Sequence, residues 1–96
     1  MIKNKAKLFK ALGDETRLKI AGCLLHQDYC ACDFVPVTKK DQTTVSRHLA
    51  ILVNSGILKY TKKGRNIIYS IKDENMKKEL VNYGIRKIKN CCREGD

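Results

Sequence analysis

The sequence lacks the marks of a membrane protein, an exported protein or an enzyme. No apolar run approaches the ~18 residues of a membrane-spanning helix, and the N-terminus has no signal-peptide core. The sequence also shows no phosphate-binding loop and no set that pairs a nucleophile with a general base. We therefore expect a cytoplasmic protein that has no membrane partner and is not an enzyme.

Acidic residues are few relative to basic ones. The 96 residues include 20 Lys and Arg against 10 Asp and Glu, which gives a formal net charge of +10. This excess favours a polyanionic partner, because basic side chains release counterions from nucleic acid, although it also serves solubility alone. The length predicts one domain over residues 1–96 with a single small core, for which a second copy is a common source of buried area.

The cysteines do not form a closed disulfide framework, because there are five of them. Four lie in close pairs, Cys30 with Cys32 and Cys91 with Cys92. In a chain without export signals, such pairs indicate metal binding or redox activity more than structural disulfides. The fifth, Cys23, falls in an apolar run and is expected to be a small core residue.

The stretch 41–56 has the pattern of a capped amphipathic helix, predicted over about 42–54. Asp41 is a good N-cap and Gly56 a good left-handed stop. The buried stripe consists of Val45, Leu49 and Leu52. The opposite face carries Gln42, Thr43, Ser46 and Arg47. Such side chains can pair with purine edges or reach phosphates, so the pattern favours a DNA recognition helix over an ordinary solvated one.

Three further elements are expected before this helix. The first is a basic helix over 1–12 that Gly13 ends, and the second is a helix that Asp14 caps. The chain is then expected to turn at 26–29, where His26 is a solvated residue. A short or distorted helix is predicted over 31–37, because Pro36 removes a backbone hydrogen bond. This element and the capped helix after it form a predicted helix-turn-helix.

After the recognition helix the period changes to that of a β-hairpin. Two β-rich runs at 57–61 and 67–71 flank a turn at 62–66 that carries Lys62, Lys63 and Arg65. Such a hairpin is a wing that can lie along a phosphate backbone, or a turn kept soluble by charge. Asp73 is expected to cap a last helix over 74–91, in which Gly84 indicates close helix approach. The predicted class is therefore mainly α with a β-hairpin wing, a winged helix-turn-helix.

The sequence resembles the ArsR/SmtB family of metal-responsive winged-helix repressors over nearly its whole length. The match consists of FKALGDETRL at 9–18, CACD at 30–33, TVSRHL at 44–49 with SG at 55–56, and GR at 64–65 followed by Tyr69. The resemblance implies a homodimer that binds double-stranded operator DNA and leaves it when an effector binds. The apolar faces of the first and last helices favour these helices as the dimer interface, although both can also pack on their own domain's core. His48 belongs to the third motif, which implies a phosphate-binding or structural hydrogen-bonding role.

The resemblance also assigns Cys30 and Cys32 to a thiolate site at the start of the helix before the recognition helix. Thiolates suit As(III) and Sb(III), and also Cd, Pb, Zn or Cu(I), and a helix N-terminus is expected to lower thiol pKa values. Because residues two apart point to different sides of a helix, joint ligation should distort that helix and misplace its neighbour. Arsenite-sensing relatives often supply a third cysteine where this chain has Val35. Cys91 or Cys92 is therefore the candidate third ligand, and the alternatives are that this pair forms a separate site or binds nothing.

Two departures from the family pattern limit the alternatives. Glu15 replaces the usual Pro, and the last predicted helix has no His, which argues against the family's Asp, His and Glu interface site. Three functions stay open: a repressor released by As(III), Sb(III) or another soft ion, a thiol redox or polysulfide sensor of the same fold, and an architectural basic protein with a structural zinc.

Overall fold

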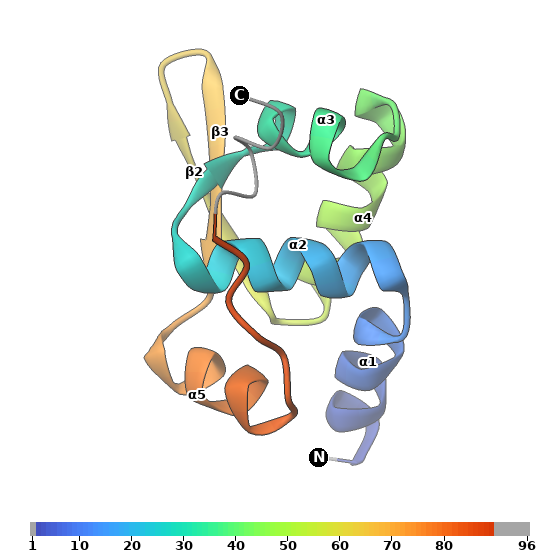
Figure 1. Cartoon of the computed structure of the whole chain (residues 1–96). Coiled ribbons are helices and arrows are strands. Elements are labelled where there is room, and N and C mark those ends of the chain that lie inside the picture. The colour runs from blue at the N-terminus through green and yellow to red at the C-terminus, as the bar shows by residue number, and fades with distance from the viewer. Residues whose placement is uncertain (1, 90–96) are drawn as a thin grey trace.

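The computed structural model describes residues 2–89, which form helices around one small sheet (Figure 1). The elements in chain order are α1 Ile2–Leu12, α2 Glu15–His26, β1 Tyr29–Cys30, the 3-10 turn η1 Ala31–Asp33, α3 Phe34–Thr38, α4 Gln42–Asn54, β2 Leu58–Lys63, β3 Asn66–Ile71 and α5 Glu74–Asn82. The predicted class, mainly α with a β-hairpin wing, is confirmed.

Helix α2 crosses the centre of the molecule and supplies the middle of the core (Figure 1). It begins where predicted, because the Asp14 carboxylate accepts a hydrogen bond from the Arg17 amide at 3.1 Å. Its Ile20 and Leu24 are fully buried and belong to one core cluster with side chains from the other helices and the sheet. The other fully buried members of that cluster include Phe34, Val45, Leu49, Leu52, Ile57 and Leu80.

The segment before the recognition helix is distorted, as Pro36 predicts. It consists of the 3-10 turn η1 and the five-residue helix α3, in which Pro36 is exposed. Lys39 then takes a left-handed conformation with φ of 60°, which turns the chain into α4. Helix α4 starts with the predicted cap, since the Thr44 amide donates to the Asp41 carboxylate at 3.0 Å.

The sheet has three antiparallel strands in the order β1-β3-β2, one more than the sequence predicts. The hairpin of β2 and β3 is confirmed, and Gly64 has the positive φ of 61° that a two-residue turn requires. The extra strand β1 lies in the region expected to be a turn, where Tyr29 pairs with Tyr69 and Cys30 with Ile68. Two residues are too few to show a strand period, so only the partner strand reveals it.

The last helix is shorter than predicted, because α5 ends at Asn82 instead of continuing to 91. Gly84 takes φ of 90°, and the Ile85 amide reaches back to the Leu80 carbonyl at 3.1 Å. This is a Schellman stop, so Gly84 ends the helix and does not mark a close approach inside it. The expected helix residues 90–91 lie outside the described residues.

The close approach belongs to Gly22 in α2. The Ile88 amide donates to the Gly22 carbonyl at 3.0 Å, and a Cβ at Gly22 would lie 2.8 Å from the Arg86 carbonyl oxygen. The chain after α5 therefore packs directly on the middle of α2. None of the helices in residues 2–89 is both long and apolar enough to cross a membrane.

Candidate functional site

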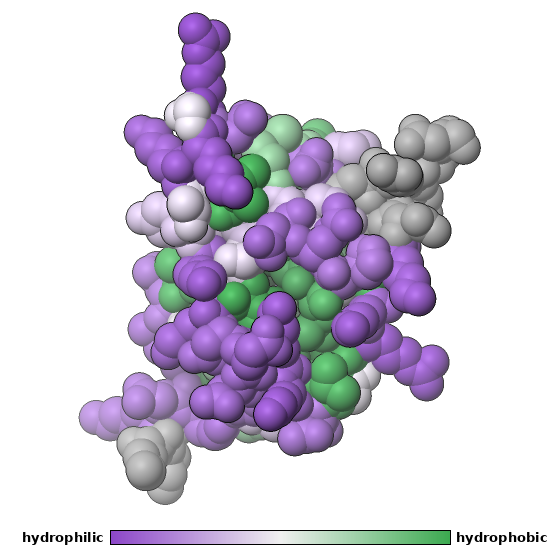
Figure 2. Space-filling model, turned by 90° about the vertical axis from the view of Figure 1, so that its left-hand side faces the viewer, coloured by the Kyte–Doolittle hydropathy of each residue, from purple (hydrophilic) through white to green (hydrophobic). Residues whose placement is uncertain are grey.

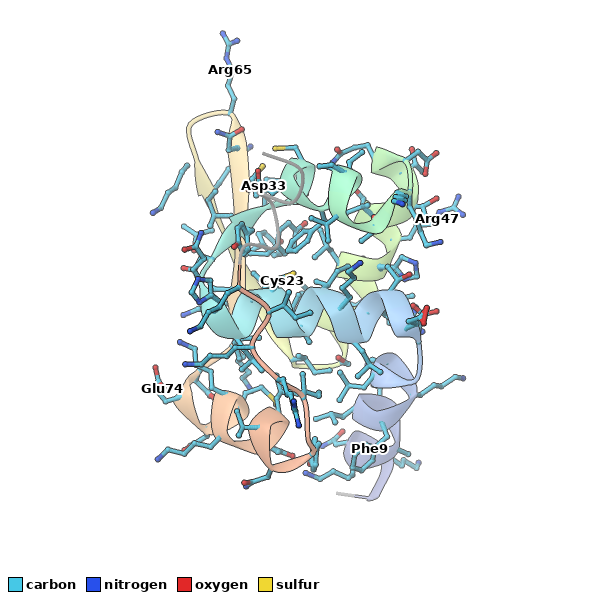
Figure 3. The ribbon with its side chains drawn as sticks, viewed as in Figure 1. Phe9, Cys23, Asp33, Arg47, Arg65 and Glu74 are labelled. Atoms are coloured by element: carbon cyan, nitrogen blue, oxygen red, sulfur yellow. The ribbon has the colours of Figure 1, made fainter. Side chains whose placement is uncertain are left out.

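The polar face of α4 is open to solvent, as expected of a helix that reads DNA. The predicted contact residues Gln42, Thr43, Ser46 and Arg47 are all exposed. Arg47 points away from the body of the molecule (Figure 3). The opposite face anchors the helix, because Val45, Leu49 and Leu52 are completely buried. The helix can therefore present its first two turns to a DNA groove while its buried face stays packed on the core.

The wing carries its cations at an exposed tip. Lys62 and Lys63 lie at the end of β2, Arg65 lies in the two-residue turn, and all three are exposed. Arg65 projects beyond the hairpin (Figure 3), and the surface at that end is hydrophilic while apolar surface gathers lower on the same face (Figure 2). The N-terminal end of α4 lies at the same end of the molecule (Figure 1), so one duplex can meet both.

His48 differs from the other predicted DNA contacts because its side chain is only 15% exposed. Its Nδ1 lies 3.0 Å from Nη1 of Arg17 and 3.9 Å from the carboxylate of Asp14. Both partners come from the start of α2, which lies far away in the sequence. The sequence pattern places Asp14 as a cap but contains no signal that would join Arg17 to the recognition helix.

Cys30 and Cys32 lie together on the surface, and the Cys32 thiol donates to Cys30 Sγ at 3.0 Å. The expectation that both begin a helix is wrong, because Cys30 ends β1 with extended angles of −76° and 152°. Only Cys32 belongs to η1, and this change of backbone brings the two sulfurs to one side. No unwinding is needed to bring them together.

Asp33 binds the backbone of Cys30 and contributes to the raised pKa of Cys32. Its carboxylate accepts a hydrogen bond from the Cys30 amide at 3.0 Å, and Asp33 lies between the wing and α3 (Figure 3). The hydrogen bond to Cys30, burial, and the charges of Cys30 and Asp33 raise the pKa of Cys32 to about 11. The expected lowering of the pKa by a helix N-terminus is wrong for Cys32, because the hydrogen bond to Cys30 and burial outweigh the effect of a turn of only three residues.

The thiol pair supplies two soft ligands, and the described chain adds no third. Within residues 2–89, no group of three or more His, Cys, Asp or Glu residues could hold a metal ion. The candidates Cys91 and Cys92 lie outside the described residues. Cys23 is completely buried in the core, as expected, but it is not a free thiol, because it forms a disulfide bond that the sequence pattern does not predict. His26 is exposed. Two thiols on one side can supply two soft ligands, which is fewer than a complete site of three or more.

Comparison with known proteins places the chain in a family. Residues 14–60 match the model of the arsR family of bacterial regulatory proteins. The chain is 42% identical over 73 residues to an HTH-type transcriptional regulator of Methanocaldococcus jannaschii, covering 75% of this chain and 82% of that protein. This chain belongs to the arsR family.

Two other relatives are longer than this chain. It is 47% identical over 73 residues to a cadmium resistance transcriptional regulatory protein CadC homolog of Staphylococcus aureus, covering 75% of this chain and 60% of that one. It is 41% identical over 66 residues to the arsenical resistance operon repressor of Escherichia coli, covering 68% of this chain and 56% of that one. The chain therefore spans little more than half of the length of these two relatives.

The fold matches a solved winged helix-turn-helix structure. The homodimeric winged helix-turn-helix DNA-binding domain of a possible ArsR-family regulator from Mycobacterium bovis superposes with a TM-score of 0.82. That match covers 88% of this chain and 78% of the other at 23% identity, so it shows the fold alone. The hairpin of β2 and β3 is accordingly the wing of a winged helix-turn-helix.

Proposed function

We propose that this protein is a homodimeric transcriptional repressor that leaves operator DNA when As(III) or Sb(III) binds Cys30 and Cys32. The observation that carries the proposal is the position of this thiol pair. It lies on the short segment 30–33 that joins the strand paired with the wing to the helix that precedes α4. A ligand there acts on both of the elements that face DNA.

The DNA contacts are proposed from the exposed basic face. Gln42, Thr43, Ser46 and Arg47 enter the major groove, and Lys62, Lys63 and Arg65 follow the phosphate backbone. His48 joins them through the ring edge that faces away from Arg17. A recognition helix and a wing at one end of the molecule fit one operator half-site, and a two-fold partner supplies the other half.

The partner copy is proposed to pack on the opposite end, where α1 and α5 lie (Figure 1). Phe9 and Tyr83 stack there with ring centroids 5.0 Å apart, yet Phe9 stays 48% exposed. Val81 on α5 is 52% exposed. Large apolar side chains left exposed on two helices at this end favour a second copy as the cover.

Release follows from the geometry that a bound ion demands. Two sulfurs at about 2.3 Å from one ion lie about 3.8 Å apart at a tetrahedral angle and about 3.3 Å apart at a right angle. The intermediate angles of three-coordinate As(III) therefore also need more than the 3.0 Å between the sulfurs of Cys30 and Cys32. Binding therefore pushes the two sulfurs apart. One route carries this change through Phe34 and the left-handed turn at Lys39 to α4, and another passes through the pairing of Cys30 with Ile68 to the wing. The state that binds the ion best is then not the state that binds DNA best.

The third ligand is proposed to be Cys91 or Cys92. As(III) takes three sulfurs, and the described chain offers two that are free and close together. X-ray absorption of the As(III) complex should count three sulfur neighbours in wild type and fewer in a Cys91→Ser, Cys92→Ser double variant. An unchanged count would remove the terminal pair from the site.

The choice of ion is tested by titration. Relatives named for arsenical and for cadmium resistance both support a soft effector, so Cd, Pb or Zn is the alternative to As(III) and Sb(III). Graded As(III), Cd(II) and Zn(II) are added to the complex of the protein with a duplex that it has selected in vitro. We expect As(III) to release the DNA at the lowest concentration. If Cd(II) alone releases the DNA, cadmium is the effector and As(III) is not. If none of the three ions releases the DNA, metal sensing is refuted.

A second function is favoured by the same thiol distance. Exposed sulfurs only 3.0 Å apart can also join covalently when an oxidant or a polysulfide removes their hydrogens. Mass spectrometry of the metal-free reduced protein after exposure to oxidant separates the two functions. A Cys30–Cys32 bond that forms together with DNA release would favour the redox sensor.

A further inference from the structure

Arg17 joins three elements that meet behind the recognition helix. Its Nε donates to the Ala11 carbonyl at the end of α1, and its amide donates to the Asp14 cap of α2. Its Nη1 lies 3.0 Å from Nδ1 of His48 in α4. The guanidinium is thus occupied inside the protein, although a basic residue on a DNA-binding protein would ordinarily be counted among the phosphate contacts.

The contact with Arg17 decides which ring nitrogen of His48 carries the proton. A guanidinium has only donors, so Nδ1 must accept and must carry no hydrogen. The neutral ring then holds its proton on Nε2. No buried side-chain nitrogen or oxygen in the described part of the chain lacks a partner, and Nε2 has no protein partner there, so Nε2 reaches solvent.

We propose that Arg17 is a positioning residue for DNA binding, which locks His48 as the Nε2–H tautomer and aims that N–H at the DNA backbone. His48 then has two separate tasks, because Nδ1 seats α4 on α2 and Nε2–H donates to a phosphate oxygen. The inference rests on the proposed DNA binding, but the tautomer itself exists in the free protein. It assigns Arg17 a role that does not require it to touch DNA.

The tautomer is read directly by ¹⁵N NMR of the imidazole in the free wild-type protein. We expect an unprotonated Nδ1 and a protonated Nε2 for His48. In Arg17→Met the lock is lost, and the two nitrogens should move toward the averaged shifts of exposed His26. Lys10→Met is the matched control, because it removes one exposed cation from the neighbouring helix without touching His48. A protonated Nδ1 in wild type would overturn the proposal.

Salt dependence separates positioning from direct contact. Arg17→Met should weaken binding to the selected duplex about tenfold with an unchanged slope of log affinity against log salt, because no phosphate contact is lost. A phosphate-binding arginine would instead lower that slope by about one. A slope lowered in this way would contradict the proposal.

Two substitutions of His48 divide the tasks of its ring. His48→Asn puts an amide oxygen at the place of Nδ1, so it should keep the melting temperature of wild type and lose DNA affinity. His48→Gln puts an amide N–H at the place of Nε2 but loses the Arg17 contact, so it should melt earlier. Equal melting temperatures for the two variants would show that the contact between Arg17 and His48 does not stabilise the packing of α4 on α2. If wild type binds no DNA, the proposed function fails, while the NMR result still decides the tautomer.

Discussion

The recognition helix and the thiol segment lie close together but are built in opposite ways. Helix α4 has 13 residues, a side-chain cap at its start, a Schellman stop at Gly56 and three completely buried side chains. Residues 30–33 contain the last residue of β1 and a 3-10 turn, with no buried side chain. Many buried contacts make a rigid element and few make a yielding one. The protein therefore places its DNA reader on firm support and its proposed sensor on a segment that can shift.

The difference in support is tested most strongly by Leu49→Ala in α4. Leu49 is completely buried, so its loss should cost about 2–5 kcal/mol of unfolding free energy. Urea denaturation measures the loss. Ile51→Ala is the control on the same helix, because Ile51 is 41% exposed and should cost much less. Equal losses would show that α4 is not seated by its buried face.

The reading role of α4 is tested by Arg47→Ala. Arg47 is exposed on the proposed groove face, so its loss should weaken operator binding by about 1–3 kcal/mol and relax sequence preference. Fluorescence anisotropy with the selected duplex and single-base variants of it measures both effects. Unchanged affinity and preference would remove Arg47 from the interface.

The wing should respond differently from the helix. Lys63→Ala removes an exposed cation, so it should weaken binding to all sequences alike and lower the salt slope by about one. Measurements on the selected duplex and on an unrelated one at several salt concentrations show the pattern. A loss confined to the selected duplex would mean that the wing reads bases.

The smallest expected effect is a pH dependence of metal affinity, which follows from the pKa of Cys32 in the thiol segment. The pKa of Cys32 is raised to about 11, so the thiol is protonated below that pH and Cd(II) must displace its proton. Cadmium affinity should therefore rise with pH between about pH 6 and about pH 8. Arsenous acid takes up each thiol proton in released water, so its affinity should stay nearly flat. Competition titrations at several pH values measure both, and a flat cadmium curve would contradict cadmium binding that displaces a thiol proton.

Local signals in the sequence predict most of the fold. The caps Asp14, Asp41 and Asp73 each accept a hydrogen bond from the amide three residues later, as the spacing indicates. The wing is also clear, because β-rich runs flank a glycine turn. These features depend only on neighbours in the chain, so a pattern contains all that is needed to find them.

Non-local features escape the sequence pattern. Strand β1 exists because β3 lies beside it, and Gly22 must be a glycine because the chain near Ile88 crosses it. From the sequence alone, Gly84 could lie inside a helix or end one, and only its positive φ in the structure shows that it ends the helix. For the site, the sequence predicts Cys30 and Cys32 as a pair, but they lie on one side only because Cys30 ends a strand and does not begin a helix. The contact between Arg17 and His48 spans 31 positions and cannot be found from the local pattern.

The central claim is that a ligand bound to residues 30–33 changes how helix α4 binds DNA. The most direct test is whether arsenite releases the protein from DNA. Cys30→Ser and Cys32→Ser each keep the size of the side chain and remove one thiolate, while Ala31→Ser between them is the matched control. We predict that all three variants bind the selected duplex, that arsenite releases wild type and Ala31→Ser, and that both cysteine variants stay bound. Full release of Cys30→Ser or Cys32→Ser by the same arsenite concentration would contradict the account.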